Sequence, residues 1–208
     1  MRRAALLGSL GVLLLAWITV AVDASLTIHM AAHMAAVAIA APLLAFALAG
    51  TWADPARAWP LVVAPLPMSI VEMVVVWGWH LPAARAFAAT PAGLTLEQAM
   101  FLGSGLLLWS ACLGSRGTAS AVLRLSGVVA LLLTTMHMTL LGALVALAPR
   151  PLFMAHGHSS GAAAMLDQQM AGVVMLAVGA GSYLAGALLL LSRTLFDSPA
   201  DSRGQGAQ

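Results

Sequence analysis

The histidines and methionines of this chain are spaced in a way that suits metal binding. His29 and His33 are four residues apart, and Met30 and Met34 form a second pair with the same spacing. Residues four apart lie on one face of a helix, so each pair offers two side chains of one kind to a shared ligand. Imidazole binds copper in either oxidation state, and thioether is a soft ligand that selects Cu(I). With a third imidazole from His137, the pattern predicts a copper site.

Other side chains are candidates for completing or supporting this site. His80 is a further candidate ligand, although its place beside Trp79 also fits an aromatic belt at the membrane interface. Asp167 is a candidate too, although an aspartate near the start of a helix is also a natural cap. The predicted soft auxiliary ligands are Met30, Met34 and Met138. The groups predicted to orient the imidazoles or to handle protons are Glu72, Asp167, Gln168 and Gln169.

The composition of the chain is that of an integral membrane protein. Of its 208 residues, 62% are hydrophobic and only 8% are charged, whereas soluble domains are about 45–50% apolar and about 25% charged. The chain has no lysine, and its nine arginines are scattered. This composition excludes a soluble enzyme, a nucleic-acid-binding protein and a disordered scaffold. The single cysteine, Cys112, excludes an internal disulfide and CxxC-type motifs.

Six apolar runs are long enough to cross the roughly 30 Å of a bilayer's hydrocarbon core. Because lipid offers no partners for backbone polar groups, spans of this length are expected to be helices. The predicted spans cover residues 4–22, 25–49, 60–80, 94–113, 120–147 and 165–191. The fold class is therefore all-α, a polytopic membrane helical bundle of about six transmembrane helices in a single domain, residues 1–192. Residues 193–208 are predicted to form a polar, disordered cytoplasmic tail.

The arginines predict the orientation of the bundle in the membrane. With a cytoplasmic N-terminus, seven arginines lie on the cytoplasmic side and only Arg85 and Arg150 lie outside. Cytoplasmic loops carry such an excess of positive charge, so both termini are predicted to be cytoplasmic. The first span follows Arg2 and Arg3 and is therefore also a candidate signal peptide. Its apolar stretch is longer than a usual signal core, and we expect a retained helix.

In this orientation all six histidines fall in the outer half of the bundle or in an outer loop. At 1.5 Å per residue, His29 and His33 lie about 6 and 12 Å below the outer surface, and His137 lies about 15 Å deep. Glu72, deep within the third span, is in the same half. Ionisable groups inside spans are costly and usually mark function. Their convergence predicts one polar site near the extracytoplasmic face, walled by four helices.

Four short segments resemble motifs of one protein family. Residues 29–34 (HMAAHM), followed by residues 41–44 (APLL), are similar to the HMxxHM…APLL segment of the CtaG family of bacterial cytochrome c oxidase assembly factors, which are associated with caa(3)-type oxidases. The other resemblances, in family order, are residues 79–82 (WHLP), residues 137–143 with their HM and LGA, and residues 167–172 (DQQMAG). Together they extend over nearly the whole chain, from about residue 25 to residue 191.

The resemblance implies a factor of the bacterial plasma (inner) membrane that assists assembly of a copper centre, with a haem–copper oxidase subunit as its client. One element departs from the family pattern. Members usually have HxxEH at the start of the fourth predicted span, whereas this chain has Leu94 and Gln98 in place of both histidines and keeps only Glu97. The metal site of this chain is therefore expected to differ from that of its relatives.

Other functions stay open on the sequence alone. Histidines from two facing helices also serve as axial ligands of haem, so a haem-binding electron-transfer protein is the main alternative. A copper or proton transporter would need a polar path through both leaflets, and the inner half of the chain offers almost none. A structural scaffold for oxidase subunits with a vestigial site is a third alternative. No nucleophile and base are arranged for catalysis, so we expect no enzymatic activity.

Overall fold

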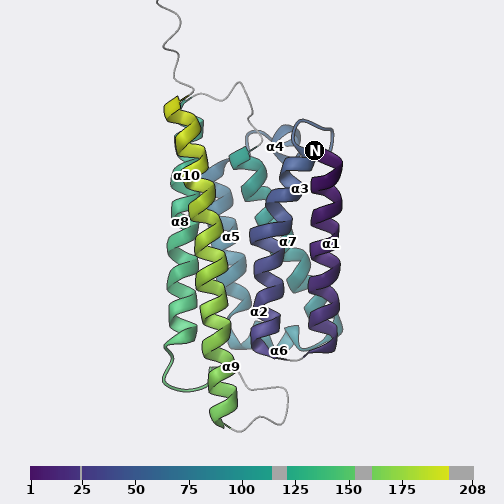
Figure 1. Cartoon of the computed structure of the whole chain (residues 1–208), viewed down its shortest axis with the longest axis vertical. Helices are drawn as coiled ribbons and strands as arrows, with labels where there is room; N and C mark the ends of the chain where they lie inside the picture. The colour runs from purple at the N-terminus through teal and green to yellow at the C-terminus, as the bar shows by residue number, and fades with distance from the viewer. Residues whose placement is uncertain (24, 114–120, 153–160, 197–208) are drawn as a thin grey trace, which may run out of the picture.

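The computed structural model describes residues 1–23, 25–113, 121–152 and 161–196, and the regular structure in these residues is helical throughout. The helices lie side by side along the long axis of the molecule (Figure 1). The long helical segments in chain order are α1 (Arg2–Val22), α2–η1–α3 (Leu26–Leu48), α5 (Pro65–Trp79), α7 (Pro91–Leu113), α8 (Ala121–Ala146) and α9–η2–α10 (Gly161–Phe196). Two short helices, α4 (Pro55–Ala58) and α6 (Pro82–Ala88), flank α5 in the chain.

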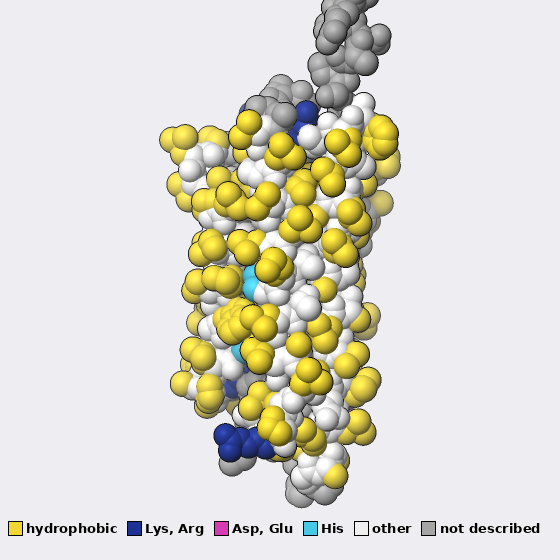
Figure 2. Space-filling model, turned by 90° about the vertical axis from the view of Figure 1, so that its left-hand side faces the viewer, with side chains coloured by type: hydrophobic (Ala, Val, Ile, Leu, Met, Phe, Trp, Pro, Cys, Tyr) yellow, Lys and Arg dark blue, Asp and Glu magenta, His cyan; other side chains and the backbone are white. Residues whose placement is uncertain are grey.

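The described helices confirm an all-α polytopic membrane bundle. Five of them are long and apolar enough to cross a membrane, and α5 with α6 makes a sixth if the bent pair is one span. The face drawn in Figure 2 carries hydrophobic side chains along its whole length and arginines near both ends. Among the side chains of α1, only Ser9 and Ala16 are buried. The outer surface of the bundle is therefore suited to lipid rather than to water.

The two ends of the bundle differ in the helix termini and arginines that lie there. The start of α1, the short helix α4 and the end of α10 lie at one end in Figure 1. At the other end lie α6 and the N-terminal turns of α2 (Leu26–Met34) and α7, and we call this the α6 end. Arg57 is on α4 and Arg193 is on α10, whereas Arg85 is on α6. This separation is the one that the arginine pattern predicts, and the direction of the bundle in the membrane stays a prediction.

Two of the long segments contain a wide, π-helical turn in their middle. In the first, η1 (Ala35–Ala40) separates α2 from α3 (Ala41–Leu48). Pro42 lacks a backbone N–H, and its ring pushes against the carbonyl four residues earlier, so the regular α-helical ladder cannot continue there. Side chains from two neighbours use the η1 carbonyls: Trp109 Nε1 donates to the Val37 oxygen at 3.0 Å, and Ser9 Oγ donates to the Ala40 oxygen at 2.9 Å.

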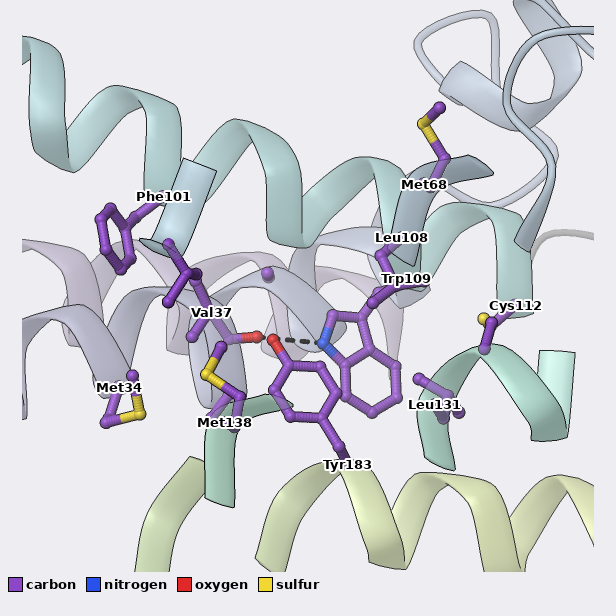
Figure 3. Packing of buried hydrophobic residues seen from close by; sticks show 14 of the residues in the cluster. Met34, Val37, Met68, Phe101, Leu108, Trp109, Cys112, Leu131, Met138 and Tyr183 are labelled. Carbon is purple, nitrogen blue, oxygen red and sulfur yellow. Dashed lines mark hydrogen bonds between the residues drawn. The ribbon is translucent and has the colours of Figure 1, made fainter. Parts of the chain in front are cut away.

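A glycine on α7, Gly105, allows this helix to pack closely against η1 and α3. A Cβ atom at Gly105 would lie 3.1 Å from Ala41 Cβ and 3.2 Å from Val37 Cα. Glycine therefore lets the two helices approach closely, and Phe101 and Trp109 of α7 pack among the buried residues on either side (Figure 3). The contact fixes α7 beside η1 and α3. Glu97, one helical turn before Phe101, then reaches the α2 histidines.

The segment boundaries differ most from the predicted spans around α5 and at both ends of the last helical segment. The third span was predicted from residue 60, but α5 begins at Pro65 and the chain bends by 78° after Trp79 into α6. The last helical segment begins at Gly161 rather than at residue 165. It ends at Phe196, inside the predicted tail, and the rest of that tail lies outside the described residues. The wide turn of this segment is η2 (Met175–Ala180), which separates α9 from α10 (Gly181–Phe196).

Candidate metal centre

Two histidines and a glutamate meet at the α6 end of the bundle. His29 and His33 come from α2, and Glu97 comes from the first turns of α7. The Nε2 atoms of His29 and His33 lie 3.0 Å and 3.5 Å from Oε2 of Glu97. The potential ligand atoms of the three residues all lie within 4.8 Å of one another. Together with Arg85, which contacts two of them, we call these residues the Glu97 cluster.

The distances and burial of these three side chains fit a small metal ion. Two ligands that each bind an ion at about 2.1 Å in tetrahedral geometry lie about 3.4 Å apart, close to the 3.0 Å and 3.5 Å observed. His33 and Glu97 are fully buried. Neither ring nitrogen of His33 has a hydrogen-bond partner among the described residues. Buried polar atoms without partners are costly, and a bound cation would satisfy the nitrogen that has the lone pair.

Arg85 already places a positive charge in this cluster. Its Nη1 atom donates to Oε1 of Glu97 at 3.1 Å and lies 2.6 Å from Nε2 of His29. The guanidinium group is mostly buried, with 18% of the Arg85 side chain exposed. The carboxylate of Glu97 is therefore shared between a guanidinium group on one oxygen and two imidazoles on the other.

Two aromatic groups fix the orientation of the His33 ring. Phe101, four residues after Glu97 on α7, stacks on His33 with 4.0 Å between the ring centroids. The centroid of the His80 ring lies 6.5 Å from that of His33. Nδ1 of His80 lies 2.6 Å from the carbonyl oxygen of Val76. Since a carbonyl can only accept, Nδ1 carries the proton, which leaves Nε2 of His80 as the nitrogen with a lone pair. His80 thus lies next to the cluster, as a neighbouring imidazole.

The predicted methionines gather in the interior, beyond the histidines. Met30, Met34 and Met138 are fully buried. A Cβ atom at Gly179 of η2 would lie 3.1 Å from Sδ of Met34 and 3.7 Å from Cβ of Met138. Figure 3 shows the side chains of Met34 and Met138 on the same side of Val37. The side chains of Met34 on α2 and Met138 on α8 therefore both pack against one glycine. Met136, in contrast, is 68% exposed on the outside of the bundle.

His137 is not part of the Glu97 cluster. The group of potential ligands found among the described residues contains His29, His33 and Glu97. His137 is buried on α8, and α9 packs against both α8 and α2. Similar depth did not bring the third imidazole together with the first two, because α2 has α7 rather than α8 on its histidine side. Both ring nitrogens of His137 lack a hydrogen-bond partner within the described part of the chain.

Glu72 has a tyrosine as its partner instead of an imidazole. It is fully buried on α5, and its Oε1 accepts a short hydrogen bond from the hydroxyl of Tyr183 on α10. The Tyr183 ring stacks on Trp109 with 5.4 Å between the centroids. Oε2 of Glu72 has no hydrogen-bond partner among the described residues. We call Glu72, Tyr183 and Trp109 the Glu72 cluster; the prediction that Glu72 orients a ligand histidine has no contact to support it.

Asp167 and Gln168 join helices, and neither contacts the four histidines that the structure describes. Asp167 is not at the start of its own helix, because α9 begins at Gly161. Its carboxylate instead caps α2, accepting hydrogen bonds from the backbone N–H groups of Leu26 at 2.7 Å and Thr27 at 3.0 Å. Gln168 donates to the Val145 carbonyl at the end of α8 and accepts from the N–H of Leu152.

Asp167 and Gln168 together hold α9 against α2 and α8. Asp167 also fixes the start of α2, the helix that carries His29. Gln169 is half-buried at the next position. His156 and His158, the two histidines predicted for an outer loop, lie outside the described residues.

Two members of the cluster, Glu97 and Arg85, were missed as site residues. Glu97 was singled out only as the residue kept from the HxxEH pattern. Its depth in the membrane could have indicated it. Glu97 is three residues into the fourth predicted span, and His29 is four residues into the second, so the two lie at similar depth. Arg85 lies in the segment expected to be a loop, where nothing in the sequence indicates that α6 folds back over the bundle.

Comparison with known protein families matches residues 2–196 to the cytochrome c oxidase caa3 assembly factor family, Caa3_CtaG. The chain belongs to this family. The match covers every described helix, so the Glu97 cluster lies within the family's domain. Searches of curated proteins and of solved structures gave no match. Membership confirms the family resemblance that the HMAAHM and DQQMAG segments indicate.

Proposed function

We propose that this protein binds a copper ion at His29, His33 and Glu97 and supports assembly of a haem–copper oxidase by supplying or holding that copper. The observation that carries the proposal is the meeting of two imidazoles and a carboxylate in an apolar bundle. The family is one of cytochrome c oxidase assembly factors. The client is then an oxidase subunit in the same plasma membrane, with the site near the extracytoplasmic face.

Copper is favoured over zinc by the surroundings of the cluster. Imidazole and carboxylate suit both metals, but thioether sulfur is a soft ligand that suits Cu(I). Met30 and Met34 are buried on the helix that carries both histidines, and Met34 meets Met138 at Gly179. The thioethers give a copper ion soft neighbours along the interior of the bundle.

Three protein ligands also suit a factor that gives its metal away. A site with an open coordination position lets a ligand of the client enter before the donor ligands leave. The cluster offers two imidazoles and one carboxylate, with His80 nearby. This incomplete set favours a holding site from which copper can be transferred, and we propose no catalytic step for the protein itself.

The geometry disfavours haem between His29 and His33. Axial histidines must lie on opposite faces of a porphyrin, usually on different helices. The rings of His29 and His33 come from adjacent turns of one helix, and their centroids are 4.4 Å apart, which leaves no space for a porphyrin between them.

The direct test is the copper content of detergent-purified protein. We expect wild-type protein loaded with Cu(I) and then desalted to keep near-stoichiometric copper, and the double variant His29→Ala, His33→Ala to lose it. His137→Ala is the matched control, since it removes a buried imidazole outside the cluster. Circular dichroism and gel filtration report whether each variant is folded.

Equal copper in the wild type and in a folded double variant would refute the metal site. A haem band that survives washing would favour the electron-transfer alternative. In cells, the double variant should lower the copper content of the membrane's cytochrome c oxidase, and His137→Ala should leave it unchanged.

A further inference from the structure

Arg85 is positioned by the backbone of its helix. A Cβ atom at Gly93 of α7 would lie 2.0 Å from the carbonyl oxygen of Phe87 on α6. Only glycine allows this approach, so the C-terminal end of α6 rests directly on the first turn of α7. The two helices that carry Arg85 and Glu97 are thereby fixed to each other next to the cluster.

The guanidinium group lies against two of the three proposed copper ligands. Its Nη1 atom is 2.6 Å from Nε2 of His29 and 3.1 Å from Oε1 of Glu97. An ion bound by His29 at about 2.1 Å would lie no more than about 4.7 Å from Nη1. At this range, in a mostly buried site, two positive charges repel each other with little screening by water.

The charges of the cluster cancel before any ion binds. Glu97 contributes one negative charge, Arg85 contributes one positive charge, and histidines that act as ligands are neutral. A monovalent ion would leave one net positive charge in the buried site, and a divalent ion would leave two. Uncompensated charge away from water is costly, and the cost rises with the charge.

We propose that Arg85 determines the charge of the ion that the Glu97 cluster accepts, by favouring a monovalent over a divalent metal ion. The inference rests on the proposed metal site and deepens it. Repulsion between Arg85 and the ion is proportional to the charge on the ion, so a divalent ion is disfavoured twice as strongly as a monovalent one. Arg85 thus selects Cu(I) by charge, independently of the soft methionine sulfur atoms.

The test compares two metal ions that do not change oxidation state, Ag⁺ as the monovalent probe and Zn²⁺ as the divalent probe. Affinities of detergent-purified wild-type protein and Arg85→Gln are measured at one pH and ionic strength by competition with a chromogenic chelator. Removing the charge should raise both affinities. The fold increase in Zn²⁺ affinity should be about the square of the fold increase in Ag⁺ affinity, for example about 100-fold against about tenfold. The reason is that the repulsion energy is twice as large for a divalent ion.

Two variants serve as controls. Arg85→Lys keeps the positive charge, and its ratio of Zn²⁺ to Ag⁺ affinity should stay within about threefold of the wild-type ratio. It also keeps the proposal testable if Arg85→Gln does not fold. Arg150→Gln removes an exposed arginine after α8 that is not part of the cluster, and it should change neither affinity.

The outcomes separate this inference from the proposed function. If wild-type protein binds Ag⁺ and Arg85→Gln raises both affinities by one factor, the arginine only blocks access and the charge selection is refuted. Unchanged affinities in Arg85→Gln, or a ratio in Arg85→Lys that shifts as far as it does in Arg85→Gln, would refute it as well. In these cases the copper site stands. Failure of wild type and all variants to bind either ion would refute both proposals.

Discussion

Glu97 and Glu72 are both fully buried carboxyl groups inside one bundle, yet their partners differ in kind. Glu97 lies at the α6 end among two imidazoles and a guanidinium group. Glu72 lies on α5 and is bonded to the hydroxyl of Tyr183, which is stacked on Trp109. The first set consists of groups that bind cations or carry positive charge, and the second consists of hydrogen-bonding and aromatic groups. We infer that the partners of a buried carboxyl group are a better guide to its role than its depth.

The sharpest test of this difference removes one carboxylate at a time. Glu97→Gln should weaken copper binding by more than about 100-fold, beyond what loss of a group that only orients a ligand costs. Glu72→Gln should leave the affinity within about threefold, because no imidazole of the described residues contacts it. Chelator competition on the purified proteins measures both. Equal losses in the two variants would mean that the clusters act as one site.

A second test asks whether the Glu72 cluster stabilises the bundle. Tyr183→Phe removes the hydroxyl donor and leaves both oxygens of Glu72 without a described partner. We expect the free energy of unfolding in detergent to fall by about 1–3 kcal/mol, the usual cost of an orphaned buried polar group. Copper affinity should not change. A loss of copper without a loss of stability would contradict the assignment.

The smallest expected effect concerns the cap that α9 provides for α2. Asp167→Ala leaves the backbone N–H groups of Leu26 and Thr27 without their acceptor. Loss of a helix cap costs about 1 kcal/mol, which a shift in the thermal midpoint would show. Because His29 lies one turn further along, copper binding should weaken by less than about tenfold. Complete loss of copper would show that Asp167 acts on the metal directly.

The sequence was sufficient for the fold and for half of the cluster. Composition and apolar runs predicted an all-α membrane bundle, because a chain with 8% charged residues cannot cover itself with a hydrated surface. The spacing of His29 and His33 correctly placed both rings on one face of α2, since that spacing is a property of the helix itself.

What the sequence did not reveal is which helices are neighbours. The sequence places the polar side chains of His33, Glu72 and His137 at comparable depth in the membrane. Depth alone does not determine which helices are in contact. The close approach at Gly105 places α7 against η1 and brings Glu97 to the histidines. Arg85 depends on the 78° bend after Trp79, which the prolines and alanines between the two predicted spans do not indicate. Helix order and bends arise from packing between distant segments.

The bend between α5 and α6 also determines how near the cluster is to the membrane surface. With 15 residues, α5 is about 22 Å long, whereas the hydrocarbon core is about 30 Å thick. Lipid beside this wall must become thinner, or headgroups must descend to the level of α6. The proposed client, an oxidase subunit, would then reach Arg85 and His29 from that side of the bilayer without entering the acyl chains.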